Sequence, residues 1–158
     1  MDISLGLMIA ATALYAGSVT VVAETRTTSR RAARTAGAGT AAVVAGVFLL
    51  MILLAHVAYP ATWALGAAFA VVATHRTLRA DLGARTAAST AVGVAALVAA
   101  SFVFVSYLAP MALIGALGVY RLLRLGLTPR SALVAMGGSL SALLAAAAAT
   151  FAVALSTM

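Results

Sequence analysis

The architecture of this chain is clearest in Arg26–Tyr59, RTTSRRAARTAGAGTAAVVAGVFLLMILLAHVAY. Four arginines lie in its first part, and no Arg, Lys, Asp or Glu follows from Gly37 to Tyr59. An apolar run of about 20 residues is long enough to cross a bilayer as a helix. Arginines beside such a run indicate its cytoplasmic end. The stretch therefore predicts a membrane-spanning helix that begins on the cytoplasmic side.

The same pattern recurs along the chain, because all ten basic residues are arginines in clusters between apolar runs. The clusters are Arg26, Arg30, Arg31 and Arg34; Arg76, Arg79 and Arg85; and Arg121, Arg124 and Arg130. The chain is 65% hydrophobic and 8% charged, whereas soluble domains carry about 25% charged residues. No aromatic residue that could stack on a base is interleaved with the arginines. We therefore expect no nucleic-acid partner, and expect the arginines to contact anionic lipid or a cytoplasmic partner.

We expect an all-α, polytopic transmembrane helical bundle that forms one integral membrane domain over residues 1–158. The expected spans are 3–23, 37–59, 61–75, 86–109, 111–124 and 131–157. The third and fifth are short enough to suggest re-entrant segments. If either failed to cross, an arginine cluster would move to the opposite side, so the positive-inside rule favours six spans as three helical hairpins with both termini outside. The short fifth span would need local bilayer thinning or shielding by a partner.

Two further patterns concern how the chain arose and the kind of organism that encodes it. Arg76-x-x-Arg79 is followed by Arg85 at the same spacing at which Arg121-x-x-Arg124 is followed by Arg130. This spacing indicates either a duplicated hairpin or only the common composition of such loops, and the sequence leaves both open. Arginine without lysine, beside abundant Ala, Val, Gly and Thr, is typical of a GC-rich prokaryotic genome. We therefore expect a multi-pass protein of a prokaryotic plasma membrane.

Catalytic and metal-binding chemistry is sparse. His56 and His75 are expected near opposite membrane faces, too far apart to share a haem or a metal ion. The chain has no cysteine, which excludes disulfides and thiolate metal sites. Gly137-Gly138-Ser139 resembles the serine motif of rhomboid proteases, but no histidine follows Ser139. We expect no cofactor, no metal and no enzyme activity.

The carboxylates are also expected outside the membrane. Asp2, Glu24 and Asp81 lie at expected ends or loops, and Asp81 would pair with Arg85 at the i+4 position of a helix. Within the spans, His56 and Tyr15 are the intramembrane polar candidates, because an ionisable group in a span is a functional hypothesis by default. The alternative is that such a group simply bonds a neighbouring backbone carbonyl.

Small residues spaced four apart are the strongest signal apart from topology. Helices in lipid associate by close packing, and small faces permit it. These faces are Gly138, Ala142, Ala146 and Thr150; Ser89 and Gly93; and Ala13 and Gly17. They either pack the six helices together or dock another subunit, and the sequence leaves both possibilities open.

The expected function follows from the small-residue helix faces and from the lack of catalytic and metal-binding motifs. We expect a small non-catalytic membrane subunit that docks into a larger assembly, such as a transport, secretion or respiratory complex. Its partners would be the bilayer, including anionic lipid, and other membrane subunits or further copies of the chain. The alternative is a stand-alone oligomeric transporter of small solutes, since hairpin repeats occur in transporters. The shortage of polar groups within the spans argues against the alternative.

Overall fold

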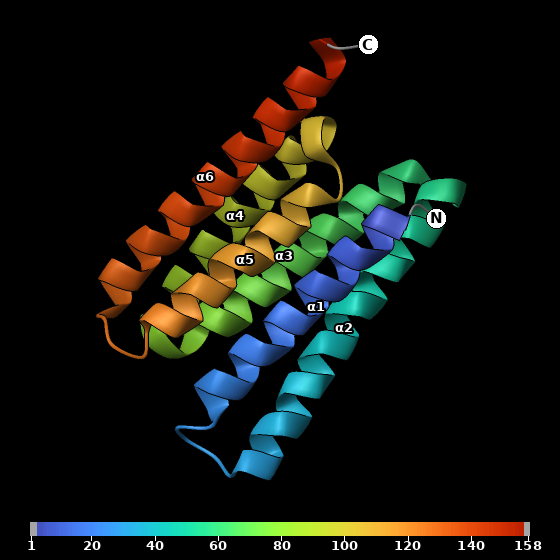
Figure 1. Ribbon diagram of the computed structural model, residues 1–158. Coiled ribbons are helices and arrows are strands. Elements are labelled where there is room, and N and C mark those ends of the chain that lie inside the picture. The colour runs from blue at the N-terminus through green and yellow to red at the C-terminus, as the bar shows by residue number, and fades with distance from the viewer. Residues whose placement is uncertain (1–2, 157–158) are drawn as a thin grey trace.

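The computed structural model describes residues 3–156, apart from the side chains at positions 103, 104, 154 and 155. The described residues form six α-helices and no strand, which confirms the all-α prediction (Figure 1). The helices are α1 (Ile3–Glu24), α2 (Arg30–Val57), α3 (Tyr59–Leu82), α4 (Ala84–Val105), α5 (Leu108–Leu123) and α6 (Pro129–Ser156). Of these, α1, α2, α4 and α6 contain segments long and apolar enough to cross a membrane, which is consistent with a membrane location. Thr157, the expected end of the last span, lies outside the described residues.

Local sequence explains where the helices begin and end. Ser29 caps α2, because its hydroxyl accepts a hydrogen bond from the backbone N–H of Ala32. Pro60 lies in the first turn of α3, where its missing N–H costs nothing. Gly83 separates α3 from α4 with a φ of 75°, a backbone conformation that favours glycine.

Helix α3 continues well past the expected third span. It has 24 residues, or about 36 Å at 1.5 Å per residue, and it ends at Leu82 instead of His75. No Gly or Pro interrupts the segment after His75, and Leu78 within it is completely buried. Burial of that leucine and the contacts of Asp81, described below, hold these turns as helix.

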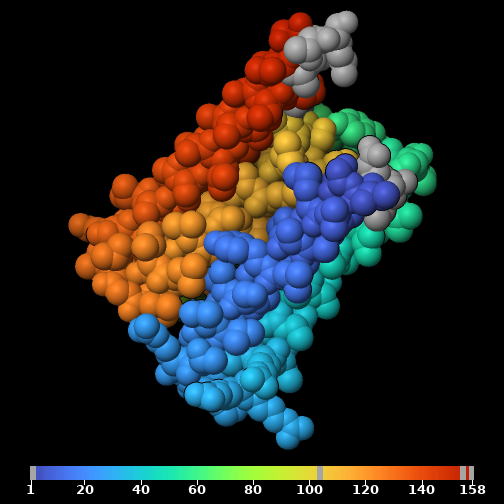
Figure 2. Space-filling view, in the orientation of Figure 1, coloured from blue at the N-terminus to red at the C-terminus, as the bar shows by residue number. Residues whose placement is uncertain are grey.

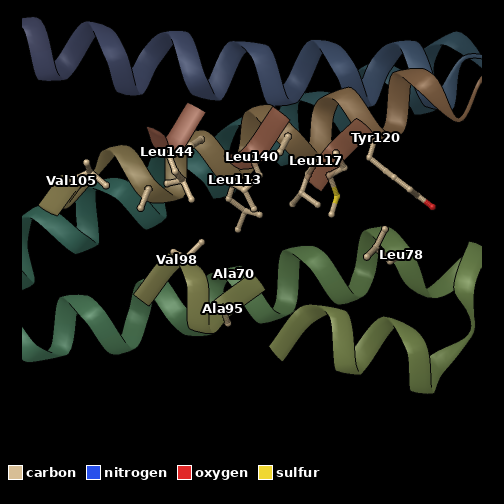
Figure 3. Packing of buried hydrophobic residues seen from close by; sticks show 14 of the residues in the cluster. Ala70, Leu78, Ala95, Val98, Val105, Leu113, Leu117, Tyr120, Leu140 and Leu144 are labelled. Carbon is tan, nitrogen blue, oxygen red and sulfur yellow. The ribbon is translucent and has the colours of Figure 1, made fainter. Parts of the chain in front are cut away.

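Consecutive helices make the most extensive contacts: α3 with α4, α1 with α2, and α5 with α6. Helix α1 also packs against α5, and α2 against α3. Figure 2 shows α1 lying across the front of the molecule and α6 along one edge. The larger core cluster lies between α5 and α6 on one side and α3 and α4 on the other, as Figure 3 shows for Leu113, Leu140 and Val98.

Helix α5 is the most enclosed element of the bundle. It contacts α1, α3, α4 and α6, and residues from Ala109 to Tyr120 are buried on several of its sides. Its 16 residues span about 24 Å, less than a bilayer core of about 30 Å. Four other helices of the same chain contact it, so much of the short helix is shielded from lipid within the chain.

Helices α1 and α2 approach each other closely at two glycines. A Cβ added at Gly17 would lie 2.9 Å from the carbonyl oxygen of Gly37, and one added at Gly37 would lie 2.7 Å from that of Gly17. Separations this short leave no room for a side chain at either position. The two glycines therefore set how closely these helices pack.

Candidate functional site at the arginine end of the bundle

The turns that carry the arginine clusters lie together at one end of the bundle, which we call the arginine end. It comprises the α1–α2, α3–α4 and α5–α6 turns with the adjoining helix ends (Figure 1). The start of α1 and the end of α6 lie at the opposite end (Figure 1). Arginine side chains tie the turns together: Arg26 Nη1 donates to the carbonyl oxygen of Leu125 at 3.4 Å, and Arg124 donates to Asp81.

Asp81, Tyr120 and Arg124 form the best-defined polar cluster. Arg124 donates to both carboxylate oxygens of Asp81, from Nε to Oδ2 at 2.9 Å and from Nη2 to Oδ1 at 2.7 Å. The hydroxyl of Tyr120 donates to Oδ2 at 2.7 Å, and Figure 3 shows the Tyr120 side chain extending away from the α5 backbone. Arg124 Nη1 also donates to the carbonyl oxygen of Leu127. The cluster joins the end of α3 to the end of α5 and the following turn.

This pairing differs from the sequence expectation that Asp81 would pair with Arg85. Among the residues that the structure describes, the Asp81–Arg124 contact is the one ion pair. Asp81 lies beyond the expected third span, and the hydrogen bonds from Arg124 lower the pKa of its carboxyl group. Partial burial opposes that shift, and the Tyr120 hydroxyl supports it. Asp81 is therefore a fixed anion that positions two helices.

Arg121 is the second arginine held by a neighbouring helix. Its Nη1 donates to the hydroxyl oxygen of Thr20 on α1 at 3.1 Å, and Thr20 is buried. The remaining eight arginines are exposed: Arg26, Arg30, Arg31, Arg34, Arg76, Arg79, Arg85 and Arg130. The arginine end thus has an inner pair, Arg121 and Arg124, that joins helices, and an outer exposed set, of which Arg26 also bonds the α5–α6 turn.

The two histidines lie apart, as the sequence indicates. His56 lies near the end of α2, and His75 lies 16 residues after the first residue of α3, or about 24 Å along the helix. The Nδ1 of His56 bonds the carbonyl oxygen of Ile52, one turn back in its own helix, at 2.7 Å. This contact matches the alternative that His56 bonds a neighbouring backbone carbonyl. Asp2 lies outside the described residues, so the structure gives no account of it.

Tyr15, the other intramembrane candidate, joins α1 to α5. Its hydroxyl donates to the carbonyl oxygen of Gly115 at 3.3 Å. Its ring lies against Gly118, where an added Cβ would collide with Tyr15. Tyr15 therefore has a packing role that depends on Gly118, 103 positions away, and no pattern in the sequence indicates that pairing.

The small-residue faces divide into two kinds. Ala13 and Gly17 are buried, with Gly17 packed against α2. The others are exposed: Gly138, Ala142, Ala146 and Thr150 on α6, and Ser89 and Gly93 on α4. A Cβ added at Gly138 or Gly93 would meet no atom within 4 Å. The α1 face thus works inside the chain, whereas the α4 and α6 faces point away from it.

No family model, curated protein or solved structure gives a significant match to the chain.

Proposed function

We propose that this chain is a small, non-catalytic subunit that docks into a larger membrane assembly, such as a transport, secretion or respiratory complex. The six helices cross the plasma membrane of a prokaryote as three hairpins. The arginine end faces the cytoplasm, and both termini face outward. Docking uses the small-residue face of α6, which comprises Gly138, Ala142, Ala146 and Thr150.

The exposure of that face carries the proposal. Helix α6 packs onto the bundle through Ala132, Met136, Leu140 and Leu144, all of which are buried. Gly138, Ala142 and Ala146 each lie two residues from one of these, and a step of two residues turns about 200° around a helix. Thr150 follows Ala146 by four residues and is also exposed. The docking face therefore points almost directly away from the chain. Small residues there let a second helix approach closely, which is the main source of helix association in lipid.

The arginine end supports a second contact of the same subunit. Eight exposed arginines lie at this end, and Asp81 is already bound to Arg124. A cationic surface of this kind attracts anionic lipid headgroups or an acidic cytoplasmic segment. Electrostatic attraction would hold the subunit at a fixed depth while α6 docks.

The test is purification in a mild detergent with identification of the proteins that remain bound. Wild-type chain should retain defined companions, and Gly138→Leu and Ala142→Leu should lose them while keeping wild-type thermal stability. Ala10→Leu is the matched control, because Ala10 is exposed on α1 between Leu7 and Leu14, which are also exposed. Leucine there should change neither property.

Two outcomes would overturn the proposal. If both α6 variants retain the companions, the small face contacts lipid and does not dock. If the wild-type chain purifies as a homo-oligomer without companions, the alternative of a stand-alone small-solute transporter becomes the better explanation.

A further inference from the structure

A pocket of about 390 Å³ lies between α1, α2, α3 and α5; we call it the four-helix pocket. Sites for small molecules occupy about 300–1,000 Å³, so the space suits part of a larger ligand or a small whole one. Helix α6 contributes no lining residue. The four-helix pocket is therefore separate from the proposed docking face.

The pocket changes character along its length. Its lining toward the arginine end is polar, with Thr20 from α1, Thr40 from α2, Arg76 and Thr77 from α3, and Arg121 from α5. All four helices thus place a polar side chain at the same end. We call this part the mouth.

The inner part of the pocket is apolar. Val44, Phe69 and Ile114 line it, one each from α2, α3 and α5. Ile114 and Arg121 are seven residues apart on α5, so the apolar part begins about 10 Å from the cationic mouth. One end therefore favours an anion and the other favours hydrocarbon.

The charge at the mouth is uncompensated. No acidic residue occurs among the described residues that line the pocket, and Asp81 is bound to Arg124 instead. Arg121 gives one hydrogen bond to Thr20, out of five guanidinium N–H donors. Arg76 and Arg121 together present forked donors, and such donors match phosphate oxygens well.

We propose that the four-helix pocket binds an anionic phospholipid, with its phosphate at Arg76 and Arg121 and part of one acyl chain against Val44, Phe69 and Ile114. The position of the mouth supports a lipid. It lies at the arginine end, where headgroups meet helices under the proposed topology. Basic pockets between membrane helices are suited to such headgroups. A soluble phosphate would satisfy the mouth alone and leave the apolar part without a function.

The experiment measures which lipids stay bound to the full chain. Protein reconstituted with equal phosphatidylglycerol and phosphatidylcholine is returned to detergent, and retained lipids are counted by native mass spectrometry. Wild-type chain should retain phosphatidylglycerol preferentially. Arg76→Gln and Arg121→Gln should each lower that preference about fivefold, equivalent to about 1 kcal/mol per basic residue. The control pair Arg31→Gln and Arg130→Gln removes equal charge at the same end but outside the pocket.

A second variant narrows the pocket without changing charge or removing the Arg121–Thr20 contact. Gly39 lines the pocket, and a Cβ added there meets no atom within 4 Å. Gly39→Leu should therefore fold normally, occupy the pocket and lower phosphatidylglycerol retention. Gly46→Leu is its matched control, because Gly46 lies two turns further along α2, is equally unobstructed and does not line the pocket.

Three results would overturn the proposal. The first is equal retention of the two lipids by the wild-type chain. The second is an equal loss of preference in the pocket and control arginine pairs, which would mean general attraction to the arginine end. The third is full displacement of the lipid by millimolar inorganic phosphate, which would identify a phosphate site that makes no use of the acyl chain.

Discussion

Arg124 and Asp81 form a bidentate pair across 43 residues of sequence, with N–O distances of 2.9 and 2.7 Å. Their side chains are 28% and 23% exposed, so water screens this contact less than an ion pair on an open surface. Two parallel hydrogen bonds also fix the relative orientation of the groups. The pair therefore holds the end of α3 against the end of α5.

Removing the carboxylate should lower stability. Asp81→Asn leaves Arg124 without its anion and Tyr120 without a charged acceptor, and we expect a loss of about 1–3 kcal/mol in the free energy of unfolding. Arg85→Gln is the control, because Arg85 is exposed and lies at the i+4 position from Asp81. Denaturant unfolding in detergent measures both. A larger effect from Arg85→Gln would show that the local pair is the one that forms in solution.

The same pair should make the free energy of unfolding depend on pH in the acid range. Arg124 lowers the pKa of Asp81 in the folded chain below its usual value of 3.8. A lowered folded-state pKa gives stability that is fully present above the unfolded-state pKa and is lost as the pH falls through the folded-state pKa. Wild-type and Asp81→Asn chains should therefore differ by a constant amount near neutral pH and converge below about pH 4. A difference in unfolding free energy that persists unchanged at pH 2 would contradict this assignment.

The sequence predicted helices far better than the contacts between them. Apolar runs bounded by arginines, together with Pro60, located all six helices. The i, i+4 spacing of opposite charges predicted Arg85 as the partner of Asp81, because the two are close in sequence. The observed partner, Arg124, lies on another helix, and only the packing of α3 and α5 brings it near. In the same way, only the packing of α1 against α5 brings Tyr15 next to Gly118.

Spacing also could not show which way a face points. On α6, both Ala132–Met136–Leu140–Leu144 and Gly138–Ala142–Ala146–Thr150 repeat every four residues. The first series is buried and the second is exposed, because Met136, Leu140 and Leu144 fill the space beside α5 better than glycine or alanine does. On α1, where Gly37 of α2 offers no side chain, the small face of Ala13 and Gly17 turns inward instead.

The α1–α2 crossing should tolerate no added side chain. Gly37→Val would place atoms against the carbonyl oxygen of Gly17, at a position where even a Cβ would be only 2.7 Å away. Backbone on one side and a packed helix on the other leave little room to relax, so we expect a loss of about 1–3 kcal/mol from overpacking. Gly46→Val, on the same helix with open space around it, should behave nearly as wild type. Thermal unfolding in detergent compares them, and equal melting temperatures would show that α1 and α2 separate easily.

The proposed topology can be tested with single cysteines, because the chain has none of its own. Suitable exposed sites are Thr27, Ala80 and Gly126 at the arginine end, and Ala58 in the turn between α2 and α3. A membrane-impermeant thiol reagent applied to intact cells should label Ala58→Cys. It should label the other three only after the cells are permeabilised.

Each departure from that pattern has a distinct physical meaning, because the helices alternate in direction. If Ala80→Cys is labelled from outside while Thr27→Cys is protected, α3 does not cross, and its 24 residues lie within or upon the membrane. If only Gly126→Cys is labelled from outside, the short helix α5 fails to cross, which its enclosure by four other helices argues against. If Thr27, Ala80 and Gly126 are all labelled and Ala58 is protected, the bundle is inverted. The arginine end would then face away from the cytoplasm, against the bias that arginines impose during insertion.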